Sequence, residues 1–117
     1  MSSFTLRDVV ITAHDMESLI ADAGAFSARI AFRDGDRYAA VDRSDLSLGV
    51  TFAAPEDHPA PGEMVLTAKA ESVEAAVAEL VASGAEVIRE PCQGAHEVRA
   101  LVRTAGGLLI TVYGARA

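Results

Sequence analysis

The chain has 117 residues, enough for one domain that buries about two-thirds of its unfolded surface but not for a second independent core. Its 50% hydrophobic and 23% charged residues are typical of a soluble globular protein and argue against disorder. The formal charge of −7 argues against non-specific binding to nucleic acid or anionic membrane, since a polyanion gains nothing by releasing counterions to an acidic partner.

The first half of the chain predicts one helix and four strands. Asp15 supplies a helix N-cap and Gly24 a C-terminal stop. Residues 25–33 then alternate with a period of two, which marks a strand with one buried face, and Phe32 is expected on that buried face. Asp34-Gly35-Asp36 is a hairpin turn signal. In chain order the predicted elements are a strand at residues 10–13, a helix at 16–23, and strands at 25–33, 37–42 and 46–53.

The second half repeats this order of elements. Ser72 caps a helix that Gly84 ends, and Pro91 ends the strand that follows. The predicted elements are a strand at residues 64–68, a helix at 73–81, and strands at 85–89, 97–103 and 108–113. We therefore predict one domain over residues 1–117, built from module one (about 4–54), a proline-rich linker (55–62) and module two (63–114).

Strand parity separates two sheet faces. The strongly apolar set is expected to face the helices and consists of Val9, Ile11, Ala13, Leu46, Leu48, Val50, Met64, Leu66, Leu108, Ile110 and Val112. The opposite set is mixed and consists of Asp8, Val10, Thr12, Ser47, Gly49, Thr51, Glu63, Val65, Thr67, Lys69, Leu109, Thr111 and Tyr113. Such a mixed face is either exposed to solvent or the wall of a small-molecule pocket.

The paired β-α-β-β-β modules, the run Phe-Arg-Asp-Gly-Asp-Arg-Tyr-Ala at residues 32–39 and the run Thr-Ala-Gly-Gly-Leu-Leu-Ile-Thr-Val-Tyr-Gly at 104–114 resemble the vicinal oxygen chelate superfamily. This superfamily includes glyoxalase I, extradiol dioxygenases, methylmalonyl-CoA epimerase and bleomycin-type resistance proteins. The resemblance covers residues 5–114. It implies an α+β fold in which two βαβββ modules form a curved eight-stranded mixed sheet, with helices on the outer face and the ligand in the concave face.

The resemblance also locates the metal ligands of the metal-using members. Carried over, the first-strand position falls on Asp8, the fourth-strand position near Gly49 and the eighth-strand position on Thr111, while the fifth-strand position is either Val65 or Glu63. A divalent metal needs at least three good donors, and these positions offer at most two. We therefore expect no metal and no cofactor, and neither ring cleavage nor glyoxalase chemistry.

Asp8 and Glu63 are the candidate catalytic residues. If both lie on the concave face, repulsion and partial burial would suit one of them to act as a general base. The alternative is that both are solvated at the rim. Lys69, the only lysine, could bind an anionic ligand, pair with Asp8 or be solvated.

Other polar and aromatic side chains have weaker claims. Arg99 and Arg103 share one strand face and suit a carboxylate or phenolate, or else lie at the surface, and Tyr38 and Tyr113 could stack on a planar molecule or serve in packing.

The three histidines are not spaced as metal ligands. We expect a local hydrogen bond between His14 and Asp15, an exposed His58 in the linker, and no nucleophile pair between His96 and Cys92. Cys92 is the only cysteine and cannot form an internal disulfide. Together with the absence of a membrane-length apolar run or a signal region, this predicts a cytoplasmic protein.

The sequence thus predicts a metal-free protein that binds a small organic molecule, such as an antibiotic-like or aromatic ligand, as a homodimer with no nucleic-acid or membrane partner. Its predicted ligand-binding residues are Val10, Thr12, Tyr38, Gly49, Val65, Thr67, Lys69, Arg99, Leu109, Thr111 and Tyr113. One alternative is an isomerase or lyase that uses Asp8 or Glu63 as the base. Another is a domain with a collapsed pocket that acts only through protein contacts.

Overall fold

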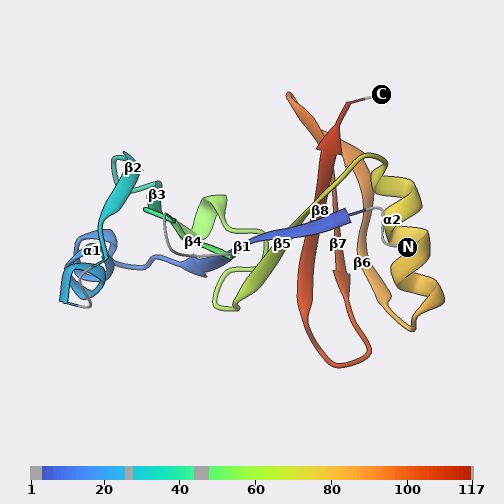
Figure 1. Cartoon of the computed structure of the whole chain (residues 1–117), viewed down its shortest axis with the longest axis horizontal. Coiled ribbons are helices and arrows are strands. Elements are labelled where there is room, and N and C mark those ends of the chain that lie inside the picture. Colours follow the sequence, from blue (N-terminus) through green and yellow to red (C-terminus); the bar gives the residue numbers. More distant parts are fainter. Residues whose placement is uncertain (1–3, 26–27, 44–47, 117) are drawn as a thin grey trace. The chain divides into compact units, whose positions relative to one another are not determined.

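The computed structural model describes residues 4–25, 28–43 and 48–116. Phe26, the turn residues 44–45, Leu46 and Ser47, which the sequence patterns assigned to elements or faces, lie outside the described residues. The elements are β1 (Phe4–Thr12), α1 (Met16–Ala25), β2 (Ile30–Asp34), β3 (Tyr38–Val41), β4 (Gly49–Ala53), a 3₁₀ turn η1 (Pro55–Asp57), β5 (Val65–Ala70), α2 (Val73–Ala82), β6 (Glu86–Gln93), β7 (Glu97–Arg103) and β8 (Leu109–Ala115) (Figure 1). The predicted α+β class, with two βαβββ modules and eight strands, is confirmed.

The chain divides into two compact units. The N-terminal unit is Asp8–Met64, and the C-terminal unit is β1 up to Arg7 together with the chain from Val65 onward. The boundary falls inside β1, so the first half of this strand belongs to the C-terminal unit, where Phe4 packs against the core.

In the N-terminal unit the strand order is β2-β3-β4-β1, with β1 parallel to β4 and the other pairs antiparallel. Asp15 caps α1 as predicted, since its carboxylate accepts hydrogen bonds from the Ser18 amide (3.2 Å) and hydroxyl (2.8 Å). The core between α1 and one face of the strands contains Ala13, Met16, Ala23, Ala39, Val41 and Phe52.

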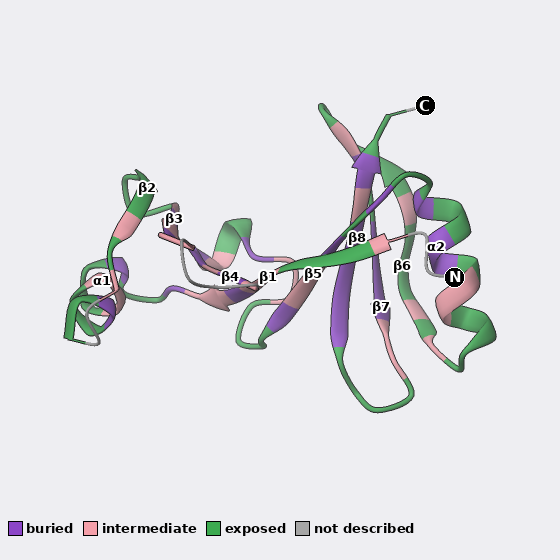
Figure 2. Cartoon of the chain, in the orientation of Figure 1, coloured by how far each residue is buried: buried purple, intermediate pink, exposed green. Residues whose placement is uncertain are grey.

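The C-terminal unit repeats this topology in the order β5-β8-β7-β6, again with its first and fourth strands parallel. Ser72 caps α2 by accepting a hydrogen bond from the Ala75 amide, and Gly84 follows the helix with a φ of 103°, as predicted. The core against α2 contains Ala68, Ala70, Val73, Ala76, Val77, Val98, Ala100, Val102, Ile110 and Val112. Figure 2 shows β8 as the most continuously buried strand.

The prediction that Phe32 is buried with its parity mates is wrong, because its side chain is 58% exposed. Ile30 is paired with Val41, whereas Phe32 is paired with Ala40, so the register shifts by one residue between Ile30 and Phe32. Such a bulge moves the following side chain to the other face of the sheet. Phe32 therefore lies on the face opposite α1.

Three further expectations about strand ends are corrected. Pro91 does not end a strand, because β6 continues to Gln93. Proline is tolerated there because β6 lies at the end of the strand order, where one side of the strand needs no ladder hydrogen bonds, and because its register with β7 shifts between Arg89 and Cys92. Met64 and Leu108, which were expected in the core, are 67% and 54% exposed because each directly precedes its strand.

α1 and α2 have ten residues each. Within the part of the chain that the structure describes, neither helix is long and apolar enough to cross a membrane.

Candidate functional site

The face of the N-terminal sheet that points away from α1 carries the predicted residues of this unit. Asp8 and Gly49 are register partners in the parallel pair of β1 and β4, Val10 is opposite Thr51, and the core lies on the alternate positions. The parity prediction for Asp8, Val10, Thr12 and Gly49 thus describes one face of this sheet, and Tyr38, which is paired with Ala53, lies on the same face.

Arg43, which the sequence patterns did not single out, forms an ion pair with Asp8 on this face. The Arg43 guanidinium Nη1 lies 3.2 Å from Asp8 Oδ1, and both side chains are partly buried. A Cβ atom added at Gly49 would lie 2.1 Å from Asp8 Oδ1 and 2.9 Å from Arg43 Nη1. The ion pair therefore occupies the space that a side chain at Gly49 would need, and Asp8, Arg43 and Gly49 form one packed arrangement.

An aromatic pair lies further along the same face. The rings of Phe32 and Tyr38 are 6.2 Å apart between centroids and inclined by 53°. Tyr38 is half-buried, while the Phe32 ring is largely exposed. The alternation of apolar and polar residues misled the prediction for Phe32. The bulge that places Phe32 on this face does not change that alternation in the sequence.

The linker residue His58 was expected to be exposed, and this expectation is wrong. His58 is only 6% exposed, its Nε2 lies 3.1 Å from the Val10 carbonyl oxygen, and its Nδ1 accepts a hydrogen bond from the Ala60 amide. The Thr12 hydroxyl accepts a bond from the Gly62 amide. The linker is therefore anchored to β1, and it engages two of the predicted ligand-binding residues.

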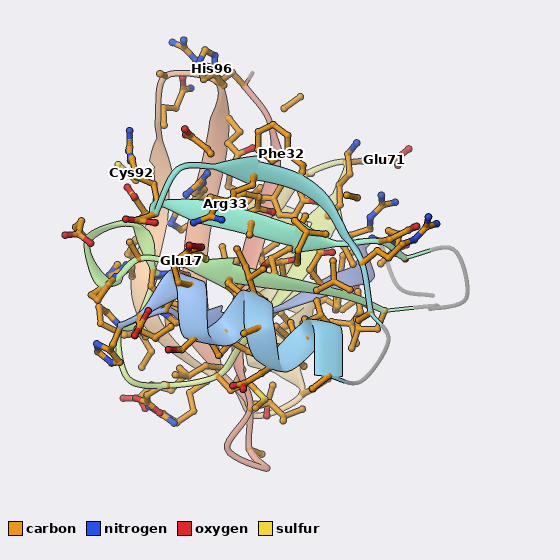
Figure 3. The ribbon with its side chains drawn as sticks, turned by 90° about the vertical axis from the view of Figure 1, so that its left-hand side faces the viewer. Glu17, Phe32, Arg33, Glu71, Cys92 and His96 are labelled. Carbon is orange, nitrogen blue, oxygen red and sulfur yellow. The ribbon has the colours of Figure 1, made fainter. Side chains whose placement is uncertain are left out.

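The other two histidines, His14 and His96, are exposed. The Asp15 carboxylate, the expected partner of His14, accepts a hydrogen bond from the Ser18 hydroxyl. Figure 3 shows Cys92 and His96 well apart, so they do not form a nucleophile pair, and the free thiol of Cys92 is exposed.

In the C-terminal unit the predicted residues form three rows across β5, β8 and β7 on the face away from α2. The rows are Val65–Leu109–Arg103, Thr67–Thr111–Leu101 and Lys69–Tyr113–Arg99. The structure therefore brings the predicted ligand-binding residues of this half onto one face, whereas Glu63 lies before β5 and outside the rows.

Burial divides these rows. Val65, Leu109 and Leu101 are buried, and Thr111 is only 7% exposed. Among the described residues the Thr111 hydroxyl is the one buried side-chain oxygen or nitrogen without a hydrogen-bond partner. The third row is different, because Lys69 and Arg99 are exposed and Tyr113 is half-buried. Arg99 is ion-paired with Glu97.

Lys69 also lines an open hollow of about 510 Å³ in the C-terminal unit. The lining residues are Phe4, Thr5, Arg7, Lys69, Ala70, Glu71 and Ala115. We call this feature the Lys69 hollow. It lies where the first residues of β1 meet the last residues of β5 and β8.

A second hollow, of about 520 Å³, lies in the N-terminal unit. Its lining is acidic and consists of Ala13, His14, Asp15, Met16, Glu17, Asp36, Ala54, Pro55 and Glu56. Arg33 neutralises part of this lining by pairing with Glu17 (2.8 Å) and Asp36 (3.1 Å), and Figure 3 shows Arg33 above Glu17. The Arg33 guanidinium therefore already provides a positive charge next to the acidic lining of this hollow.

The family's metal-ligand positions do not fit a divalent cation in this chain. The first-strand carboxylate of Asp8 already binds a guanidinium, Gly49 has no room for a ligating side chain, and Thr111 offers a neutral hydroxyl. At the fifth strand, Val65 lies within β5 and is fully buried, whereas Glu63 is exposed before the strand begins. No group of three potential His, Cys, Asp or Glu ligands occurs within residues 4–25, 28–43 and 48–116.

Comparison with known proteins gives one relative and a set of similar folds. No family model matches the sequence. An uncharacterized protein of Mycolicibacterium smegmatis is 35% identical over 111 residues, which cover 93% of this chain and 94% of that protein.

Two solved structures show the same fold at low identity. Methylmalonyl-CoA epimerase from Mycobacterium tuberculosis has a TM-score of 0.68 at 17% identity, covering 100% of this chain and 92% of that one. A glyoxalase/bleomycin resistance protein/dioxygenase superfamily member from Vibrio splendidus has a TM-score of 0.64 at 14% identity, covering 94% and 99%. The chain belongs to one family with the M. smegmatis protein, and its fold is that of the vicinal oxygen chelate superfamily.

Proposed function

We propose that the protein binds a small, partly apolar organic molecule without a metal ion and without converting it, in the manner of a sequestering protein for an antibiotic-like or aromatic ligand. The observation that carries this proposal is the Asp8–Arg43 pair packed on Gly49. At the place where metal-using members of the fold hold a cation, this chain supplies the cation from its own Arg43.

The exposed aromatic pair supports an organic ligand on the same face. Phe32 lies in one cross-strand row with Ala40, Thr51 and Val10 and contacts Tyr38, and aromatic rings give large contact area to a planar molecule. The same face of the sheet thus carries an aromatic surface and a partly buried ion pair. Together they suit a ligand with one polar group and one flat apolar body.

The isomerase or lyase alternative is less well supported by the geometry. A general base must reach a substrate proton with a carboxylate oxygen, and Asp8 Oδ1 is bonded to Arg43. Glu63 is exposed and lies before β5, away from any row of the strand pairing. Likeness to the epimerase concerns the fold alone.

The test combines metal analysis with a ligand screen on the purified protein. We expect no stoichiometric divalent metal and no rise in melting temperature with Mn²⁺, Ni²⁺ or Zn²⁺, whereas a planar natural product raises it by several degrees. Asp8→Asn and Glu63→Gln should keep most of the ligand affinity. A tightly held metal, or turnover that either variant abolishes, would contradict the proposal. If no planar compound or acyl-CoA ester stabilises the protein, the collapsed-pocket alternative is correct.

As part of the same proposal the protein is a cytoplasmic homodimer. The exposed apolar side chains of Phe32 and Ile88 are candidates for burial between two copies, and one free thiol suits a reducing compartment. Light scattering coupled to size-exclusion chromatography measures the mass in solution, and a mass of one chain would contradict the dimer.

A further inference from the structure

We infer that the Lys69 hollow is a binding site for an organic anion with an apolar body. This inference goes beyond the proposed function, because the hollow lies in the C-terminal unit, whereas Asp8, Phe32 and Tyr38 belong to the N-terminal unit. It does not involve the positions where the fold family holds metals, because none of Asp8, Gly49, Val65 and Thr111 lines this hollow.

The hollow has the size of a small-molecule site and both kinds of lining. Its volume of about 510 Å³ falls within the range of ligand pockets, about 300 to 1,000 Å³. Phe4, Ala70 and Ala115 supply apolar surface, and Phe4 is held in place by its packing against the core of the unit. An apolar body of a ligand therefore has a fixed surface to contact.

The charges of the lining select an anion. Arg7 and Lys69 are positive and Glu71 is negative, which leaves the hollow with one net positive charge in a chain of net charge −7. Lys69 is the only lysine and is exposed, and its side chain takes part in no ion pair or hydrogen bond among the described residues. Its ammonium group is available to a ligand at little cost in desolvation.

The net charge of the lining distinguishes an anion from a neutral compound. An anion is attracted by Arg7 and Lys69 and repelled by Glu71, so the summed Coulomb interaction of these three charges is attractive. Tyr113 is the register partner of Lys69 on β8, so the two side chains lie on the same face of the sheet. An aromatic carboxylate combines the negative charge and the apolar body that the lining fits.

The test measures binding of naphthoate to the full chain by titration calorimetry at low salt, with naphthamide as the uncharged analogue. We expect naphthoate to bind at least about fivefold more tightly than naphthamide, and its affinity to fall as salt is raised to about 0.5 M. Chemical shifts of backbone amides at residues 69–71 should move on binding.

Variants of two exposed residues decide the mechanism. Lys69→Met should weaken naphthoate binding about fivefold, Lys69→Arg should restore it, and Glu71→Gln should strengthen it. Arg29→Met is the matched control, because it removes one exposed positive charge that does not line the hollow. It should leave naphthoate affinity unchanged.

Equal binding of naphthoate and naphthamide, or equal effects of Lys69→Met and Arg29→Met, would overturn the inference. If naphthoate fails to bind while another planar compound stabilises the protein, the inference is wrong and the proposed function stands. If no organic compound binds at all, both are wrong. Melting temperatures of the variants confirm that each one folds.

Discussion

At the residue scale, buried polar groups in the linker hold β1 in place. His58 donates from Nε2 to the Val10 carbonyl and accepts at Nδ1 from the Ala60 amide, so both ring nitrogens are bonded. A sequence pattern shows only a histidine among prolines and cannot show that its ring is buried. The burial depends on where the linker crosses the strand.

We predict that His58→Ala lowers the free energy of unfolding by about 2 to 3 kcal/mol, because two hydrogen bonds are lost and a cavity is left. His14→Ala, at an exposed position, should change it by no more than about 0.5 kcal/mol. Urea denaturation followed by circular dichroism measures both. Similar midpoints for the two variants would show that the His58 ring contributes nothing.

A second prediction concerns the space above Gly49. Gly49→Ala should destabilise the protein by about 1 to 3 kcal/mol, because its Cβ atom would lie 2.1 Å from Asp8 Oδ1. In an Asp8→Ala background the clash is removed, so the same substitution should cost much less. A double-mutant cycle on unfolding free energies gives the coupling.

Gly114 is the matched control for this cycle. A Cβ atom there would lie 2.4 Å from the backbone carbonyl oxygen of Ala70, which no side-chain substitution removes. Gly114→Ala should therefore destabilise the protein equally with and without Asp8. Additive effects of Gly49→Ala and Asp8→Ala would contradict the arrangement described above.

At the scale of elements, the caps and turns followed the sequence while the strand faces depended on pairing. Asp15, Ser72 and Gly84 act locally, so their roles in starting and ending helices were predictable. The face of Phe32 and the continuation of β6 past Pro91 depend on bulges and on the position of a strand in its sheet, which a single strand's sequence does not specify.

The cap of α1 also predicts a dependence on pH. Hydrogen bonds from the Ser18 hydroxyl and amide hold the pKa of Asp15 below its ordinary value of 3.8. A depressed pKa in the folded state gives a contribution to stability that is complete above the unfolded value and is lost as the pH falls through the folded value. Asp15→Asn keeps a capping side chain that does not titrate in this range.

The melting temperature of the wild type should therefore fall more than that of Asp15→Asn between neutral pH and about pH 2.5. Thermal denaturation of both proteins at the two pH values measures the difference. Parallel losses would show that the Asp15 carboxylate is not preferentially bonded in its ionised form.

At the scale of the whole molecule, the described residues form two clusters of buried apolar side chains, one in each compact unit of the domain. We predict that Val112→Ala, in the core of the C-terminal unit, costs about 2 kcal/mol and speeds amide hydrogen exchange in β5, β7, β8 and α2 more than in β2, β3 and β4. Val81→Ala, at an exposed position of α2, is the control. A uniform increase over all strands would indicate a single cooperative unit.

The sequence by itself determined the order of elements, the duplication and the helix caps at Asp15, Ser72 and Gly84, because each of these follows from local chemistry and from periodicities of two or 3.6 residues. By resemblance it also indicated that the usual metal-ligand positions offer at most two donors. Only the tertiary structure decided that Arg43 pairs with Asp8 over Gly49, that His58 is buried, and that Arg7 and Lys69 line one hollow. These features join residues far apart in the chain, and their contacts depend on strand register and packing, which no local pattern encodes.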